Sequence, residues 1–150
     1  DFIPNLIKDL GFETHFKGVA IKPGKPILLS QFKQKEKLFF GLPGNPISLA
    51  VGLRFFIYPL IRNALGMSKE KQFRAKLKNE YNKMKNSTHF TRCSMTIDDK
   101  GFSNVEVLQG QQSNRMKSFV NANCWGIFNE GKEKFIPGDF VEWVPLIPSG

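Results

Sequence analysis

The sequence predicts two consecutive units, an α/β unit and a small all-β barrel, and the hydrophobic patterning carries this prediction. Helical and strand patterns alternate over residues 1–71, whereas short strand patterns separated by turns fill residues 72–150. Hydrophobic residues make up 41% of the 150 residues, which is enough for a folded core. The longest apolar stretch, 47–65, is interrupted by Arg54 and Arg62, so the sequence predicts no membrane-spanning segment.

The first unit is expected to begin with a helix over residues 3–10, whose apolar residues share one face and which Gly11 ends. Strands are expected over 16–21, 27–32 and 38–40, because short apolar runs there are separated by turn residues. This alternation of helix and strand is typical of an α/β unit.

A long helix over residues 46–65 is the best-marked element of the chain. Asn45 is a favourable N-cap, Pro46 suits the first helical position, and Gly66 suits the position just after the end. Because most of its surface is apolar, we expect this helix to be buried on most sides.

Two features of that helix predict its local shape. Pro59 lacks the amide that would bond to the carbonyl of Phe55, so a kink is expected there. The larger polar residues Arg54, Tyr58 and Arg62 are spaced by four, which places them on one narrow stripe.

The second unit contains five short strand patterns in about 75 residues, which favours a small antiparallel barrel or sandwich. The turns between them are rich in Asp, Asn and Gly, and a charged linker over residues 67–71 precedes the first strand. The expected strands are 73–77, 89–97, 102–108, 124–128 and 140–144.

The positive net charge of the chain favours anionic partners. Lysine and arginine number 22 against 13 acidic residues, and residues 1–72 carry +6 of the net charge of +9. Such a field favours nucleic acid, anionic lipid or a phosphorylated small molecule, and charge alone does not choose among them.

The cysteines and histidines exclude several site classes. Cys93 and Cys124 form no CxxC pair and are expected to be buried thiols. His15 and His89 lie far apart without metal-ligand spacing, which argues against a zinc site and against a Ser-His-Asp triad.

Two Pro-Gly loops are the candidate binding elements. Residues 22–26 and 42–46 each place Pro-Gly where a type II turn requires it. The second loop leads to a helix N-terminus, which favours an anion, and the first carries Lys22 and Lys25. Together they would form a cationic cradle for an oxyanion; ordinary surface turns are the alternative.

The strings AIKPGKP and FGLPGNPISLA, in this order, resemble the molybdopterin molybdenumtransferase family, which includes bacterial MoeA and the gephyrin E domain. The resemblance continues through LQGQQSNRMKSFVNANCWGIF and IPGDFVEWVPL, and so covers essentially the whole chain. It implies that residues 1–71 are the later part of a three-layer α/β molybdopterin-binding domain and that 72–150 are the C-terminal β-barrel domain.

The resemblance also implies a reaction. Family members insert molybdenum from molybdate into adenylyl-molybdopterin and release AMP, with Mg²⁺ assisting. Lys22 and Lys25 would neutralise the oxyanions, and Ser48 would donate a hydrogen bond or cap the helix. Asp1 would be a catalytic and metal-binding carboxylate. Because the family protein is more than twice this length, we expect the 150 residues alone to be inactive.

The turn before the long helix would complete this site. Pro43, Gly44, Asn45 and Pro46 would aim the helix N-terminus at the ligand. In the barrel, Arg115 would reach an anionic ligand or a neighbouring subunit, or lie in a surface turn.

Two positions depart from the family pattern. Gly18 stands where a basic residue is usual, although Lys17 is adjacent. Residues 112–115, Gln-Ser-Asn-Arg, stand where the family has Gly-Ser-Gly and an apolar residue, so only Ser113 matches.

The resemblance implies three partners: a molybdopterin-type small molecule, a second copy in a homodimer and an upstream molybdopterin adenylyltransferase. It also implies that the protein acts in the cytoplasm and binds neither nucleic acid nor a membrane. The alternative is a basic module without catalysis that binds RNA or a peptide as a scaffold. Against RNA, the aromatic residues follow core periodicity and are not interleaved with arginine.

Overall fold

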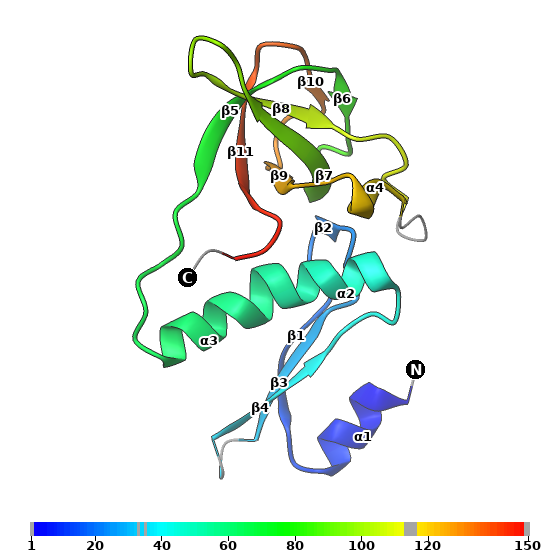
Figure 1. Cartoon of the computed structure of the whole chain (residues 1–150). Helices are drawn as coiled ribbons and strands as arrows, with labels where there is room; N and C mark the ends of the chain where they lie inside the picture. The colour runs from blue at the N-terminus through cyan, green and yellow to red at the C-terminus, as the bar shows by residue number, and fades with distance from the viewer. Residues whose placement is uncertain (1, 33, 35, 113–116, 149–150) are drawn as a thin grey trace.

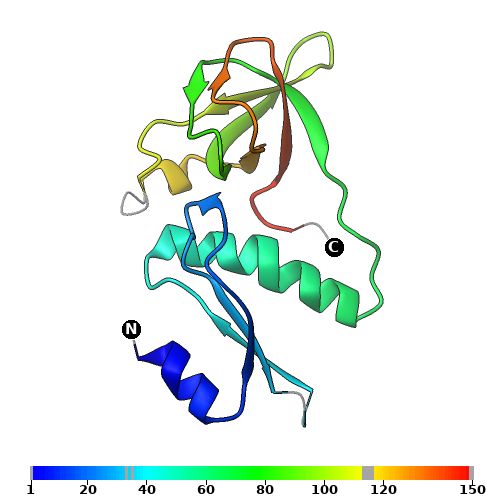
Figure 2. The same cartoon turned by 180° about the vertical axis from the view of Figure 1, so that it is seen from behind.

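The computed structural model describes residues 2–32, 34, 36–112 and 117–148. Figure 1 shows two parts, with a β-barrel above and a small sheet with helices below, and the long helix lies between them. An α/β unit followed by a barrel is the predicted fold class, which is confirmed. Figure 2 shows from behind that the end of the chain returns to the long helix after the last strand.

The first part contains a three-stranded antiparallel sheet of order β1-β3-β4. Its elements are α1 (Ile3–Asp9), β1 (Glu13–Lys17), β3 (Leu28–Phe32) and β4 (Lys37–Gly41). The strand predicted over 16–21 is wrong in its extent, because Gly18 has a φ of +87°, a left-handed conformation that ends β1. The remaining residues, Ile21–Lys22, form β2, which pairs elsewhere.

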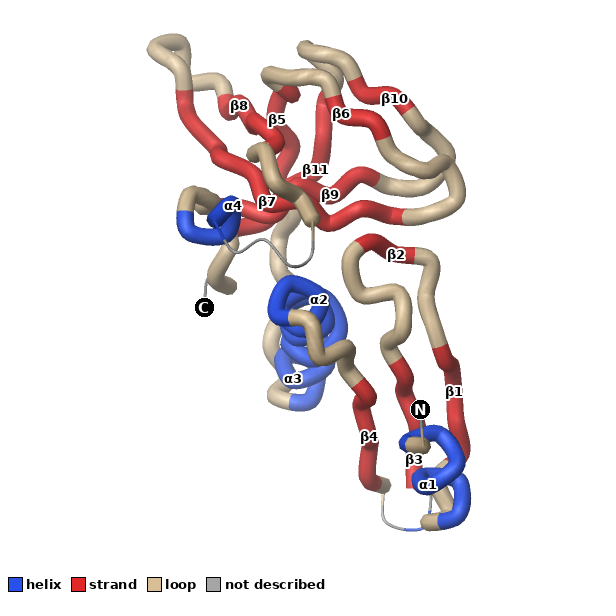
Figure 3. The backbone as a smooth tube through the Cα atoms, turned by 90° about the vertical axis from the view of Figure 1, so that its right-hand side faces the viewer, coloured by secondary structure: helices blue, strands red, loops and turns tan. Residues whose placement is uncertain are grey.

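The long helix consists of α2 (Pro46–Gly52), a π-helical turn η2 (Leu53–Ile57) and α3 (Tyr58–Ala64). The disturbance predicted near Phe55 is therefore a widened turn, which accommodates the missing amide of Pro59. At the end of the helix Gly66 has a φ of +68°, and this confirms it as the C-terminal stop. Figure 3 shows the helix end-on beside the sheet and below the barrel.

The polar stripe of this helix is buried, and part of its apolar surface is exposed. Arg54 and Arg62 of the polar stripe are only 6% and 8% exposed, whereas Leu53 and Ile61 are 46% and 50% exposed. The arginines can be buried because the segment after the helix supplies hydrogen-bond acceptors for them. Both Nε and Nη2 of Arg62 donate to the carbonyl of Ser68. The prediction that the apolar surface is buried on most sides is wrong.

The helix Pro46–Ala64 has 19 residues and is, by length and composition alone, long and apolar enough to cross a membrane. One third of its most apolar window is buried inside the protein. Core helices of soluble proteins have the same length and composition, and the buried Arg54 and Arg62 are bonded to protein groups.

The second part is a closed barrel in which each strand contacts the next in the order β7-β8-β5-β11-β9 and β9 returns to β7. All five predicted strands are confirmed. The bounds are β5 (Phe73–Leu77), β7 (Thr88–Ile97), β8 (Ser103–Val107), β9 (Cys124–Phe128) and β11 (Phe140–Pro145). The sequence did not predict the short ladder of β6 (Tyr81–Asn82) with β10 (Lys134–Phe135), or the single turn α4 (Lys117–Val120).

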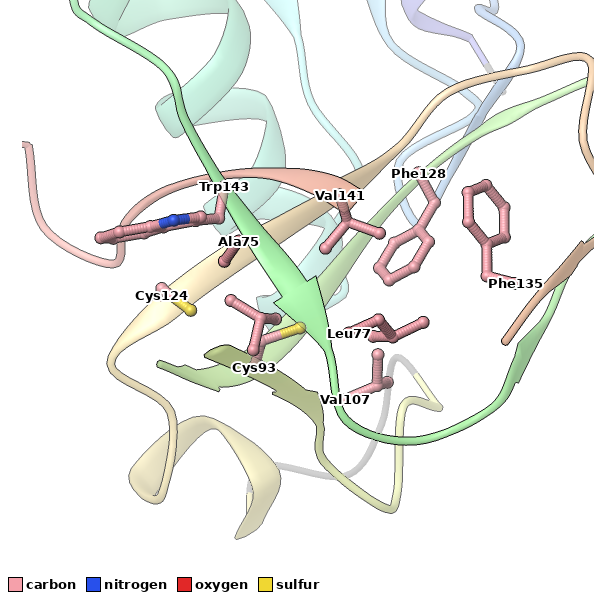
Figure 4. Close-up of a cluster of buried hydrophobic side chains, with 10 residues drawn as sticks. Ala75, Leu77, Cys93, Val107, Cys124, Phe128, Phe135, Val141 and Trp143 are labelled. Atoms are coloured by element: carbon pink, nitrogen blue, oxygen red, sulfur yellow. The ribbon is translucent and has the colours of Figure 1, made fainter. Parts of the chain in front are cut away.

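The barrel interior is filled by small aliphatic side chains and a few aromatic rings. Figure 4 shows most of them gathered together, with the ring of Trp143 at the edge of the cluster. Cys93 and Cys124 are both fully buried among them and are free thiols, as the sequence predicted. The two cysteines are opposite each other on the neighbouring strands β7 and β9.

The barrel and the long helix share a second hydrophobic cluster. Trp125 on β9 packs with Ile47 and Val51 of α2, and Phe55 stacks on Phe90 of β7 with ring centroids 4.0 Å apart. This packing fixes the helix beneath the barrel and so positions the loop that precedes it.

Candidate functional site

The first Pro-Gly loop joins the two parts of the molecule. Its leading strand β2 (Ile21–Lys22) pairs in parallel with the start of β7, where Lys22 is opposite His89. The amide of Thr88 donates to the carbonyl of Ala20 at 2.9 Å, which extends the ladder. The loop of an α/β unit thus becomes an extra strand of the barrel sheet.

Gly24 brings this loop onto the start of the long helix. It is buried and has a φ of +105°, a left-handed conformation that favours glycine. A Cβ built there would lie 3.3 Å from the Ile21 side chain and 3.7 Å from the carbonyl oxygen of Ser48. The first loop therefore passes close to the first turn of the long helix, with glycine at the point of approach.

The second loop starts the helix as predicted but does not form the predicted turn. The Asn45 side-chain oxygen accepts from the amide of Ile47 at 3.1 Å, which confirms the N-cap, and Pro46 is the first helical residue. Gly44 does not have a positive φ, so a type II turn at Pro43–Gly44 is wrong. The chain instead extends into the cap, where Asn45 has φ −74° and ψ 128°.

Ser48 lies in the first helical turn with a side chain that is 6% exposed. The cap is Asn45, so the capping role considered for Ser48 is wrong. No hydrogen bond of the Ser48 hydroxyl to any described residue is found, and this leaves it able to donate.

A cleft of about 760 Å³ lies between the first loop and the barrel. Lys22 and Pro23 form one wall, and barrel residues form the other. The barrel side consists of Tyr81, Asn82, Lys83, Met84, His89, Phe90, Thr91, Gln111, Gln112 and Glu133. Lys25 is exposed and does not line this cleft, so the structure separates the two lysines that the sequence placed together.

Two hydrogen bonds hold His89 in the wall of the cleft. Its Nδ1 lies 2.8 Å from the Tyr81 hydroxyl, and its Nε2 lies 3.1 Å from the Ser87 hydroxyl. Beside it, Lys83 donates from Nζ to the carbonyl oxygens of Met84 and Ser87 at 3.0 and 2.8 Å. Neighbouring polar groups of the cleft are therefore held in fixed positions.

Burial and charge shift the pKa values of these groups. The pKa of His89 is lowered to about 4, chiefly by burial and also by the positive charges of Lys22 and Lys83. Burial raises the pKa of Tyr81 to about 12 and lowers the pKa of Lys83. At neutral pH the cleft therefore contains a neutral imidazole and a protonated phenol, beside the side chains of Lys22 and Lys83.

Asp1 and Arg115 lie outside the described residues, so their predicted roles stay predictions. Within the described part of the chain, no group of three or more His, Cys, Asp or Glu side chains could hold a metal ion. The Mg²⁺ that the resemblance implies stays a prediction.

Arg92 is a candidate that the sequence analysis missed. It is 1% exposed, and its Nη2 donates to the carbonyls of Gly110 and Gln112 at 2.9 and 3.3 Å. Its Nε and Nη1 are buried and have no hydrogen-bond partner among the described residues. An arginine flanked by Thr91 and Cys93 in the middle of a predicted barrel strand is the signal that could have identified it.

Comparison with known families identifies both parts of the chain. Residues 1–63 match the family described as a probable molybdopterin binding domain, and residues 74–146 match the MoeA C-terminal region, domain IV. The two matches lie on the α/β part and on the barrel respectively.

Relatives match across the same span. The molybdenum cofactor synthesis protein cinnamon of Drosophila melanogaster is 37% identical over 127 residues, covering 82% of this chain and 20% of its own. The molybdopterin molybdenumtransferase of Synechococcus elongatus is 32% identical over 146 residues, covering 95% of this chain and 34% of its own. A MoeA crystal structure from Pyrococcus horikoshii, 27% identical, has a TM-score of 0.73 over 97% of this chain and 35% of its own.

The chain therefore spans about a third or less of these relatives. Its two family matches follow one another in the order of its two structural parts, with the paired Pro-Gly loops in the first. On these grounds the chain belongs to the molybdopterin molybdenumtransferase (MoeA) family of molybdenum cofactor biosynthesis.

Proposed function

We propose that the chain supplies the ligand-binding loops and the barrel of an enzyme that transfers molybdenum from molybdate to adenylyl-molybdopterin and releases AMP. The domain boundary near residue 72 belongs to this proposal: residues 1–71 contribute the loops, and 72–150 contribute the barrel. The family names support molybdopterin-related chemistry, and the detailed reaction is the proposed step.

The contact between Gly24 and Ser48 is the observation that supports this proposal most directly. It places the first loop beside the start of a helix, where free amides and the Ser48 hydroxyl would bind an anion. Lys22 then stands at the edge of a cleft large enough for a small-molecule substrate. Positive charge beside helix-end donors stabilises phosphate or molybdate oxygens.

The remaining parts of the proposal concern partners. The proposed enzyme binds Mg²⁺ through Asp1 and forms a homodimer in the cytoplasm. An adenylyltransferase supplies its substrate. Lys25 would bind a second oxyanion of the same ligand from outside the cleft, and Arg115 would serve a ligand or a second subunit. Pro43, Gly44 and Pro46 would shape the turn at the ligand.

A chimera tests the function in a complete enzyme. Residues 1–150 replace the matching stretch of the Synechococcus elongatus relative, and molybdenum insertion is measured with adenylyl-molybdopterin and molybdate. We expect activity in the chimera and a loss of at least about tenfold on Lys22→Ala, since a charge-assisted contact contributes about 1.5–3 kcal/mol.

The matched control is Lys85→Ala, which removes one exposed ammonium group away from the cleft. It should leave the rate nearly unchanged. A chimera that folds like its parent but inserts no molybdenum contradicts the proposed function, as does equal activity of the Lys22→Ala and unchanged chimeras.

A further inference from the structure

The barrel wall of the cleft contains polar groups that the two Pro-Gly loops do not explain. Tyr81, Lys83 and His89 come from β6, from the segment after it and from β7, and all three line the cleft together with the loop residue Lys22. None of them was predicted as a site residue. Burying a histidine and a lysine side by side costs free energy, which calls for an explanation.

Lys83 is 9% exposed, yet it has no carboxylate partner within ion-pair distance among the described residues. Two hydrogens of its ammonium group bond to carbonyl oxygens, and the third remains available. Glu130 and Glu133 act on it only at longer range, and Glu133 is the single carboxylate in the cleft lining. With Lys22 opposite, the cleft has an excess of positive charge.

His89 controls what the Tyr81 hydroxyl can do. A neutral imidazole has one N–H, so Tyr81 either donates its hydrogen to Nδ1 or accepts one from it. When both ring nitrogens are protonated, Nδ1 donates to the Tyr81 oxygen and Nε2 donates to the Ser87 oxygen. The phenol hydrogen of Tyr81 is then released and can donate into the cleft.

We propose that this cleft binds a tetrahedral oxyanion between the ammonium groups of Lys22 and Lys83, and that protonation of His89 releases the Tyr81 hydroxyl to bind the same anion. The position of the site rests on the proposed function, whereas the role of the barrel wall does not. Free phosphate or molybdate and the phosphate group of a nucleotide share this chemistry.

Binding of the anion is thereby linked to uptake of a proton. The groups that face His89 are Lys22 from β2, Tyr81 from β6 and Lys83 from the following segment, while the β9 residue opposite it, Phe128, is uncharged. Both lysines disfavour the imidazolium ion. An anion between them cancels that repulsion, so protonation becomes easier when the site is filled.

The test uses the 150-residue chain and measures dissociation constants by calorimetry and by chemical-shift titration. Sulfate is the main probe, since it keeps its charge across the range studied and does not obscure the titration of the protein. We expect sulfate to bind more tightly as the pH falls from about 7.5 to about 5, with protons taken up on binding. Dissociation constants for phosphate, molybdate and AMP at about pH 7.5 then show whether the site prefers a free oxyanion or a nucleotide phosphate.

The key variant is Lys83→Gln, which retains donors for the neighbouring carbonyls but removes the charge. It should weaken sulfate binding about tenfold, and the exposed-site control Lys85→Gln by less than about twofold. His89→Asn should remove the pH dependence while binding at about pH 7.5 persists. Tyr81→Phe, whose ring can keep its packing on Phe128, is a second variant that should reduce the gain at low pH.

Two results overturn the inference. One is equal affinity of Lys83→Gln and Lys85→Gln; the other is sulfate affinity that does not change with pH. If Lys22→Ala weakens binding while Lys83→Gln does not, the loop site of the proposed function stands and the barrel wall is excluded. If neither variant weakens sulfate binding, the loop site of the proposed function and the barrel-wall site are both excluded.

Discussion

Arg54 of the long helix and Glu70 of the segment before the barrel form a two-pronged ion pair, with Nη1 and Nη2 each 2.7–2.8 Å from a carboxylate oxygen. Nη2 also donates to the carbonyl of Pro145 at the end of β11, at 3.2 Å. One buried guanidinium thus connects the helix, the linker and the last strand, which are far apart in sequence. This contact, together with the Phe55–Phe90 stack, holds the α/β part against the barrel.

Glu70→Ala should destabilise the protein by about 3 kcal/mol, because it leaves a buried arginine charge without its partner. The free energy of unfolding in urea measures this change. Replacing both residues, as Arg54→Met with Glu70→Met, should recover most of the loss, since apolar side chains remove the need for pairing.

The control for this pair is Glu80→Gln, which breaks the exposed contact between Glu80 and Lys134. Its two side chains are about half exposed, so little change is expected. Equal effects of Glu70→Ala and Glu80→Gln would show that the Arg54–Glu70 pair is solvated.

The elements that sequence reasoning predicted well are those with local causes. Asn45 caps the helix, Gly66 ends it and Pro59 disturbs it, because each effect depends on residues within one or two turns. The five barrel strands were also predictable, since alternation and turn residues are local signals.

What sequence reasoning could not supply depends on distant partners. The sequence places Arg54 and Arg62 on one stripe, but it does not show that acceptors in the linker and on β11 meet the two arginines in the interior. In the same way Lys22 joins the cleft because β2 pairs with β7, a contact across more than 60 residues, while Lys25 stays outside. The roles of Tyr81, Lys83 and His89 arise from tertiary packing alone.

Stability should fall in acid through His89. In the folded protein its pKa is about 4, below the usual 6.5, so the unfolded chain binds the proton more readily between these values. Stability is therefore fully present above about pH 6.5 and declines as the pH falls toward 4, by up to about 3 kcal/mol. Urea unfolding at several pH values measures it.

His89→Asn should flatten this part of the stability profile, and His15→Asn, at an exposed histidine bonded to Gln31, should leave it unchanged. If both variants change the dependence of stability on pH equally, the acid sensitivity arises from groups other than His89.

Gly126→Ala should destabilise the barrel by about 1–3 kcal/mol, because a methyl group there would lie 2.7 Å from Cys93 Sγ and 2.9 Å from Thr91 Oγ1. Thermal unfolding measures the effect. The matched control is Gly44→Ala, at a position with no atom within 4 Å and without a positive φ. A tolerated Gly126→Ala would mean that the barrel core yields more than its packing indicates.

The barrel should fold by itself, whereas residues 1–71 should not. Strands β5, β7, β8, β9 and β11 close on one another, and their core uses residues from 73–150 only. Among the described residues, β2 alone enters the sheet from outside, by a pairing of two residues with β7. Expressing 73–150 alone and recording a cooperative thermal transition tests this; an unfolded product would place the boundary elsewhere.

The 150-residue chain should in turn self-associate through its first part. Leu49, Leu53, Leu60 and Ile61 leave an apolar strip of the long helix exposed, on the side away from its buried arginines. Exposed apolar surface of this extent favours association because burying it removes it from water. Light scattering should give a mass above that of one chain, and Leu53→Glu with Ile61→Glu should lower it, since burying two carboxylates in the contact is unfavourable.

Exposed Ile97→Glu on the barrel is the control and should leave the mass unchanged. A monomer at all concentrations would exclude this strip as a contact surface between copies.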